Sequence, residues 1–182
     1  MADSGIWLEG NWRAGWALDY YSGELGARLS RLKYRDPPDW REVEPLTDAA
    51  AAFLQQRVKV FRRGQLAALL PVPPSQSRRL QPIEVLADRL GEKTGLPVRF
   101  RYLLKTRRTP PLRSLDDPQS RREQLRGAFR VADRSLEGKR VLLFDDVYRS
   151  GETLHEVTDV LYNQGRVRAV YVLVLTKTTW RR

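Results

Sequence analysis

Two adjacent carboxylates and the short polar loop that follows them are the residues of this sequence best suited to chemistry. The apolar run 141–144 leads into Asp145 and Asp146, and residues 149–153 then bring two hydroxyls and one glycine before a helical pattern. Neighbouring acids can each accept a hydrogen bond from the vicinal hydroxyls of a ribose. The backbone N–H groups of residues 149–153, at the N-terminus of the expected helix, suit a phosphate. The spacing therefore predicts a site for a ribose 5-phosphate.

The same segment could be an ordinary strand–turn–helix unit with acidic residues at the edge of a sheet. Hydrophobic strands that end in Asp-Asp are common, so the two acids alone are weak evidence. The loop residues and their spacing favour the functional interpretation, which assigns the ribose phosphate to one continuous set of residues. That set is Asp145, Asp146, Val147, Tyr148, Arg149, Ser150, Gly151, Glu152 and Thr153.

The elements that would position this site alternate between strands and helices. We expect strands at residues 67–72, 98–104, 139–145 and 167–175, and helices at residues 24–34, 47–60 (with Thr47 as N-cap), 82–94 and 152–164. This alternation predicts an α/β fold with a mostly parallel, twisted sheet flanked by helices. We also expect a small N-terminal cap within residues 5–35, because residues 5–21 combine glycines and aromatic residues in a pattern of turns and short strands. Ligands of such sheets bind at the carboxyl ends of the strands.

The composition limits the class of protein. A chain of 182 residues can bury a sizeable core, and we expect a single domain over residues 1–182. It has no cysteine and one histidine, so disulfides and thiolate metal sites are excluded and a zinc site is disfavoured. It shows no apolar run near the ~20 residues that cross a bilayer and no signal-peptide pattern, so we expect a cytoplasmic protein with no membrane partner. The formal charge of +11 suits polyanionic partners, although a solvated arginine-rich surface would carry the same charge.

The strand and loop around the two acids resemble those of the type I phosphoribosyltransferases, whose signature is an apolar strand, two acids and a Thr-Thr-Gly-x-Thr-like loop. The resemblance implies 5-phosphoribosyl-1-pyrophosphate (PRPP) as donor, together with an acceptor that the sequence does not identify. Asp145 and Asp146 would be the catalytic acids that hold the ribose hydroxyls, and residues 149–153 would hold the 5-phosphate. The implied cofactor is Mg²⁺, which would lie between pyrophosphate and ribose oxygens, with Asp145 and Asp146 as the metal-site residues.

Two further segments could serve the pyrophosphate of such a donor. The loop after the expected 67–72 strand ends in arginines, whose forked guanidinium groups match phosphate oxygens; its candidate residues are Pro73, Ser75, Arg78 and Arg79. Residues 105–126 are too long for an ordinary connection, so we expect a flexible lid that excludes water and neutralises the leaving group. Its candidate residues are Arg107, Arg108, Arg121 and Arg122. The alternatives are an ordinary Pro-rich connection and a solvated basic loop.

An ordered set of short motifs is similar to the ComF-type phosphoribosyltransferases of bacterial competence. The similar segments are residues 16–19, 31–35, 70–73, 108–111 and 121–129, followed by the loop at residues 149–153, and the similarity spans roughly residues 12–175. The chain departs from this branch in lacking the four-cysteine zinc ribbon of its longer members. It also has Arg149 where many members have Thr. Because an arginine cannot accept a proton, a 6-oxopurine mechanism with an acidic general base at this position is disfavoured.

Two functions therefore remain open. The first is Mg²⁺-dependent transfer of phosphoribose from PRPP to an unidentified acceptor. The second is binding of single-stranded DNA by a competence or DNA-uptake accessory protein that retains the ribose-phosphate pocket, with the basic lid and the N-terminal aromatic residues contacting the strand. A homodimer is compatible with either function.

Overall fold

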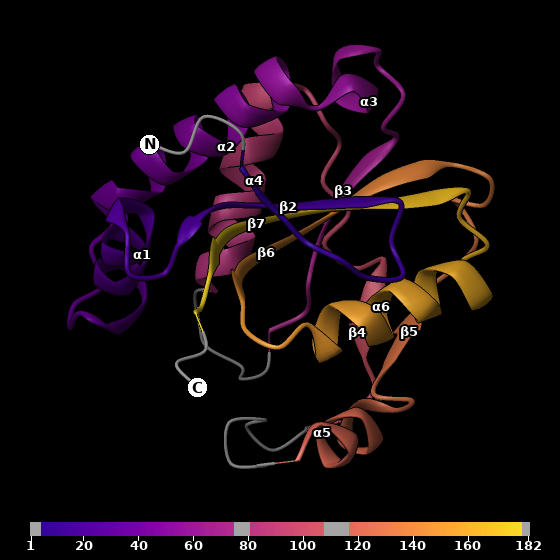
Figure 1. Cartoon of the computed structure of the whole chain (residues 1–182). Coiled ribbons are helices and arrows are strands. Elements are labelled where there is room, and N and C mark those ends of the chain that lie inside the picture. The colour runs from indigo at the N-terminus through magenta and orange to yellow at the C-terminus, as the bar shows by residue number, and fades with distance from the viewer. Residues whose placement is uncertain (1–4, 75–80, 108–116, 180–182) are drawn as a thin grey trace.

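The computed structural model describes residues 5–74, 81–107 and 117–179 (Figure 1). A five-stranded sheet forms its centre, in the order β1-β2-β7-β6-β3. The strands of this sheet are β1 (Ile6–Trp7), β2 (Ala14–Tyr20), β3 (Ala68–Pro71), β6 (Arg140–Tyr148) and β7 (Ala169–Lys177). All neighbours pair in parallel except β1, which is antiparallel to β2. The expected fold class, a mostly parallel sheet flanked by helices, is confirmed.

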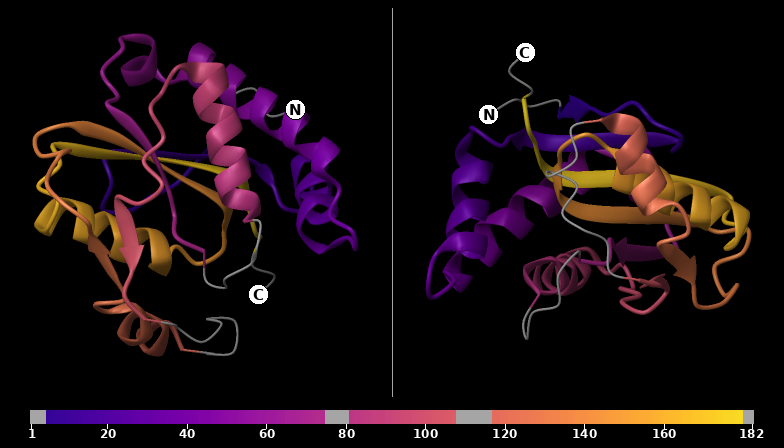
Figure 2. Two further views of the ribbon diagram at one scale, coloured as in Figure 1. Left: turned by 180° about the vertical axis from the view of Figure 1, so that it is seen from behind. Right: turned by 90° about the horizontal axis from the view of Figure 1, so that it is seen from below.

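Helices cover both faces of this sheet (Figure 2). The helices of the described residues are α1 (Glu24–Tyr34), the 3-10 helix η1 (Trp40–Glu42), α2 (Val43–Arg57), α3 (Lys59–Arg62), α4 (Pro82–Thr94), α5 (Pro118–Leu125) and α6 (Glu152–Asn163), of which α5 packs on α6 and not on the sheet. Alternate residues of β6 enter different cores, as successive side chains of a strand must. Leu142 and Phe144 pack with α1, α2 and α4, whereas Val141 and Leu143 pack with α6. The result is a three-layer sandwich around one sheet.

Residues 5–21 are part of this sheet and do not form the separate cap expected from the sequence. β2 pairs with β7 over nearly its full length, from Ala14 opposite Tyr171 to Tyr20 opposite Lys177. The turns and aromatic residues of the segment suggested an independent unit, because pairing between residues more than 150 positions apart leaves no local pattern. The N-terminal segment thus widens the parallel sheet and delivers α1 to the edge where the strands end.

Several element boundaries also differ from the expectations. Helix α2 begins at Val43 after η1, so Thr47 is not an N-cap; its buried hydroxyl donates to the Val43 carbonyl at 2.7 Å. The expected strand at 98–104 is reduced to β4 (Leu103–Lys105), with Val98 in an isolated bridge to Leu69. α1 and α4 match their expected ranges, and α4 ends at Gly95 in the left-handed conformation.

A second, two-stranded sheet lies over α6 (Figure 1). It pairs β4 with β5 (Phe129–Val131) in an antiparallel hairpin. The described part of the long insertion between these strands contains α5, where the sequence suggested an unstructured lid. Within the three described ranges, no helix is long and apolar enough to cross a membrane.

Candidate functional site

Asp145 and Asp146 lie at the carboxyl end of β6, inside the strand. Asp145 is opposite Val174 of β7, and pairing continues to Tyr148, so the strand carries both acids slightly beyond the core. The Asp146 amide donates to the Asp145 carboxylate at 2.8 Å, and Thr176 donates its hydroxyl to the Asp146 carbonyl at 3.2 Å. The sheet therefore fixes the backbone of Asp146, and the Asp146 amide orients the Asp145 side chain.

The two carboxylates have unequal electrostatic surroundings. Burial raises the pKa of Asp145, to about 8, and the neighbouring Asp146 carboxylate adds to the shift. Asp146 instead forms an ion pair with Lys33 of α1, whose Nζ lies 2.6 Å from its Oδ2. Burial opposes the charge of Lys33, but the Asp146 carboxylate outweighs it and raises the pKa of the lysine. The pair thus combines a lysine-bound carboxylate, Asp146, with a neighbour, Asp145, that resists ionisation.

Lys33 is a site residue that the sequence analysis did not select. It lies within residues 31–35, which the sequence analysis named only as one of the similar segments, 113 positions before its partner. Contact between these positions depends on β2 joining the main sheet, because that pairing places the C-terminal end of α1 beside β6. A lysine at the end of a helix is common, so no local signal distinguished it.

The loop after β6 turns sharply into α6 through Gly151. This residue has φ +85°, in the left-handed region that favours glycine, and its carbonyl accepts the His155 N–H at 2.9 Å. A Cβ at position 151 would lie 2.6 Å from the Tyr148 hydroxyl. The glycine is therefore required both by its backbone conformation and by the ring packed against it, and it leaves the first amides of α6 at the end of the loop.

Glu152 places a second carboxylate at the start of α6. The residue is 8% exposed, and Ser150 donates its hydroxyl to it. An acid in this position is stabilised by the helix dipole. It is also a negative charge beside the loop in which the sequence predicts a phosphate. A phosphate bound there would compete with Glu152 for the Ser150 hydroxyl.

The remaining residues of the predicted phosphate loop surround this turn. Tyr148 is half-buried; burial, followed by the charges of Glu152 and Glu9, raises its pKa. Lys177 lies 5.5 Å from the centre of its ring. Val147 and Thr153 are partly buried and Arg149 is exposed. The structure thus keeps the whole predicted set, residues 145–153, in one strand–loop–helix unit.

The loop after β3 begins beside the acidic pair, as the sequence predicted. Pro71 lies opposite Phe144, and the Val72 amide donates to the Phe144 carbonyl at 2.9 Å. Pro73 follows directly and is partly buried. Ser75, Arg78 and Arg79 lie outside the described residues. The structure therefore brings the start of this loop to the acidic pair, whereas the arginine assignment stays a prediction.

The predicted lid is only partly described. Arg107 donates to the carbonyl of Gln124 at 2.7 Å and to that of Arg126 at 3.3 Å, which ties the start of the insertion to the end of α5. Arg108 lies outside the described residues, and Arg121 and Arg122 belong to α5, without described side chains. The backbone amide of Gly127 in turn donates to Glu156 of α6 at 3.0 Å. The described part of the insertion is anchored to α6 at its C-terminal end.

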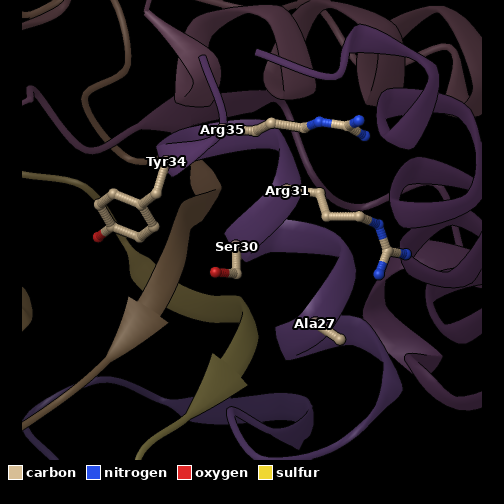
Figure 3. Close-up of a pocket in the computed structure, with 5 residues that line it drawn as sticks. All are labelled: Ala27, Ser30, Arg31, Tyr34 and Arg35. Atoms are coloured by element: carbon tan, nitrogen blue, oxygen red, sulfur yellow. The ribbon is translucent and has the colours of Figure 1, made fainter. Parts of the chain in front are cut away.

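A groove of about 490 Å³ lies along the outer face of α1, on the opposite side of the helix from its buried leucines (Figure 3). It is lined by Ala27, Ser30, Arg31, Tyr34 and Arg35. Arg31 is paired with Glu42 at 2.5 Å and Arg35 with Asp39 at 3.4 Å, so both guanidinium groups have partners beside the groove. None of the residues predicted to bind a ligand lines it.

Comparison with known proteins supports the fold. No family model matches the sequence, and no curated protein is significantly similar to it. A solved structure of the allosteric regulatory enzyme of purine biosynthesis has a TM-score of 0.53 and 21% identity, covering 81% of this chain and 30% of that chain. A hypoxanthine phosphoribosyltransferase from Staphylococcus aureus has a TM-score of 0.46 and 14% identity, covering 74% and 62%. The chain thus spans less than two thirds of either protein. Its sheet and helices share the fold of the matching part of the purine-biosynthesis enzyme.

Proposed function

We propose that the chain is a Mg²⁺-dependent phosphoribosyltransferase that uses PRPP as donor. One observation supports this function most directly: β6 carries Asp145 and Asp146 to its carboxyl end, and Gly151 then turns the chain into the N-terminus of α6. Carboxylates for a diol and the backbone amides of residues 149–153 for a phosphate are thereby separated by only two residues. Their separation suits the two ends of one ribose 5-phosphate.

Asp145 and Asp146 would accept hydrogen bonds from the ribose hydroxyls, and residues 149–153 would hold the 5-phosphate. In the reaction, the bond between the ribose C1 and the pyrophosphate oxygen breaks, the acceptor forms a bond to C1, and the acceptor releases a proton. Positive charge develops on the ribose ring as the leaving group departs. The carboxylates near the ring would stabilise that charge in a site from which water is partly excluded.

The acidic pair also fits the proposed cofactor. Mg²⁺ is a hard cation that proteins commonly hold through one or two carboxylates together with substrate oxygens and water, and Asp145 and Asp146 provide such carboxylates. No group of three or more His, Asp or Glu residues that could enclose a metal occurs in the described part of the chain. When bound, Mg²⁺ would neutralise the leaving pyrophosphate, while the two acids would orient the ribose.

The ordered motifs described above support the narrower proposal of a ComF-type enzyme. Two of their segments contribute to the site: residues 31–35 include Lys33, which pairs with Asp146, and residues 70–73 begin the loop beside Phe144. The acceptor is not specified by either segment. Arg149, exposed on the loop, continues to disfavour an acidic general base at that position.

Isothermal titration calorimetry with PRPP, in the presence and absence of Mg²⁺, tests the donor directly. We expect saturable binding that Mg²⁺ strengthens, and competition by ribose 5-phosphate. Incubation with PRPP, Mg²⁺ and a panel of nucleobases and amines, scored by pyrophosphate release, would then identify the acceptor. Absence of PRPP binding in both conditions, with the protein folded by circular dichroism, would refute the proposal.

A further inference from the structure

A group of exposed cations lies at the amino ends of the strands, across the sheet from the proposed PRPP site. We call this surface the basic rim and define it by its six exposed members, Arg99, Arg101, Arg134, Lys139, Arg166 and Arg168. They come from three loops: the turn before β4, the connection from β5 to β6, and the turn from α6 to β7 (Figure 1). Because β6 and β7 run parallel, the loops that precede them lie at the end of the sheet opposite to Asp145 and Asp146.

Hydrogen bonds between the three loops show that the rim is one continuous surface. Arg99 donates from its guanidinium to the Ser135 hydroxyl at 3.1 Å, joining the first loop to the second. The Gly138 amide donates to the Arg166 carbonyl at 2.9 Å, and the Arg168 amide donates to the Lys139 carbonyl at 2.7 Å, joining the second to the third. The six cations are therefore held near one another by the backbone.

Few acids neutralise this surface. Asp133 and Glu137 are the carboxylates within the same loops, and the closest ion pair is a long one, 3.9 Å between Arg166 and Glu137. By contrast, the arginines of α1 and η1 are paired at 2.5–3.4 Å with Glu24, Glu42 and Asp39. The rim therefore carries an excess of positive charge, and its cations have few acidic partners among the described residues.

Phe100 gives the rim an aromatic surface. The ring is 40% exposed and belongs to neither core of the sheet, and its sequence neighbours Arg99 and Arg101 are both exposed. An exposed ring between two arginines suits a ligand with a flat, unpaired aromatic group and negative charges on either side. A single-stranded nucleic acid has this pattern, because its bases are available for stacking and its phosphates follow the chain.

The backbone of Arg166 adds an independent argument. Arg166 has φ +50°, in the left-handed region. Among the described residues, it is the one with positive φ that is not a glycine. A left-handed conformation is costly for a side chain with a Cβ and would favour glycine at this turn. The Arg166 side chain makes only a long ion pair within the protein, so it does little to offset the cost of this backbone conformation. An arginine at this position is better explained if its side chain binds a ligand.

We propose that the basic rim binds single-stranded nucleic acid, with phosphates on the six cations and a base stacked on Phe100. This binding is separate from the proposed transfer reaction and uses the opposite edge of the sheet. It differs from the sequence-based expectation, which placed a strand on the insertion at residues 105–126. The charges there include Arg107, whose guanidinium already donates to the end of α5.

Fluorescence anisotropy with labelled oligothymidine and oligouridine of about 20 nucleotides, and with a duplex of the same length, tests the proposal. Both single strands should bind more tightly than the duplex, and the relative affinities of the two will identify DNA or RNA as the better ligand. With phosphates on all six cations, the logarithm of the affinity should fall against the logarithm of the salt concentration with a slope of about −4. Saturating PRPP should leave this affinity unchanged, which separates the rim from the pocket.

Two variants and one matched control separate the rim from general charge. Arg166→Gly combined with Arg168→Gln should weaken binding of oligothymidine about tenfold and bring the salt slope nearer to zero by about 1.4. Because glycine relieves the strain at position 166, this variant should unfold at a temperature no lower than the wild type. Arg41→Gln combined with Arg57→Gln removes the same charge from exposed positions elsewhere and should change the affinity less than twofold.

Phe100→Ala should weaken the single strands about tenfold without changing the salt slope, because it removes stacking and no charge. Equal affinity of the rim variant and its control, or displacement of the oligonucleotide by PRPP, would overturn the proposal. So would the absence of single-strand binding at low salt. A duplex that binds more tightly than either single strand would also contradict it, since paired bases cannot stack on Phe100.

Discussion

The two ends of the parallel strands differ in chemistry. At the carboxyl ends, which we call the carboxyl edge, β6 carries two acids and the chain then turns through a glycine into a helix. At the amino ends, which we call the amino edge, the strands follow loops rich in arginine. The residues of the carboxyl edge lie within nine consecutive positions, 145–153, and their main partner from elsewhere is Lys33. The residues of the amino edge come from three loops spread over positions 99–168. A site built from one segment can be recognised in a sequence, while a site assembled from several loops becomes visible only after folding.

The electrostatics of the two edges differ in the same way. At the carboxyl edge, charges are partly buried and coupled, and burial together with Asp146 raises the pKa of Asp145. At the amino edge, the cations are exposed and screened by solvent, so each contributes little alone and the group acts through its total charge. Substitution of a single charged residue should therefore change ligand binding strongly at the carboxyl edge. At the amino edge, several charged residues must be replaced together to change it as much.

The largest expected effect is at the acidic pair. Above pH 8, where Asp145 has lost its proton, Asp145→Asn combined with Asp146→Asn should lower PRPP affinity more than 100-fold. Each lost charge-assisted hydrogen bond is worth about 1.5–3 kcal/mol. Calorimetry measures this affinity. The same variant should bind oligothymidine as the wild type does. If single-strand binding falls with PRPP binding, the two edges do not act separately.

Gly151→Ala should weaken PRPP binding at least tenfold and lower stability by about 1–2 kcal/mol. The new Cβ would meet the Tyr148 hydroxyl at 2.6 Å, in addition to the strain of φ +85°. The matched control is Gly95→Ala, which has φ +71° but no atom within 4 Å of its Cβ position. Urea unfolding should show a loss of stability in both variants, with the loss of PRPP affinity confined to Gly151→Ala.

The pKa of Asp145 predicts a dependence of stability on pH. The unfolded chain releases the proton of this acid near pH 4, whereas the folded chain keeps it to about pH 8. Between these values the folded state binds more protons, so stability falls as the pH rises. Asp145→Asn removes this loss, so the variant should unfold at a higher temperature than the wild type at pH 8 and at nearly the same temperature at pH 4. A melting series from pH 4 to 8 measures the effect; equal slopes for the two proteins would contradict it.

The smallest effect is expected at Glu152. Glu152→Gln removes a negative charge beside the loop that we propose to bind the 5-phosphate, and it should strengthen PRPP binding about threefold. The same change loses a favourable interaction with the dipole of α6, so stability should fall by about 0.5 kcal/mol. Asp159→Asn, an exposed acid two turns further along α6, is the matched control and should leave PRPP affinity unchanged. Weaker PRPP binding by Glu152→Gln would indicate that this carboxylate takes part in holding the donor.

The sequence alone determined the strand–loop–helix unit of residues 140–163 and helices α1 and α4, because their signals are local. A run of apolar residues ends at Asp145, Gly151 permits the turn, and Gly95 stops α4 in the left-handed conformation. The tertiary structure decided the rest. It placed β2 beside β7, brought Lys33 to Asp146, docked α5 on α6 and gathered the basic rim from separate loops. These features depend on contacts between residues tens to more than a hundred positions apart, for which the spacing of neighbouring side chains contains no information.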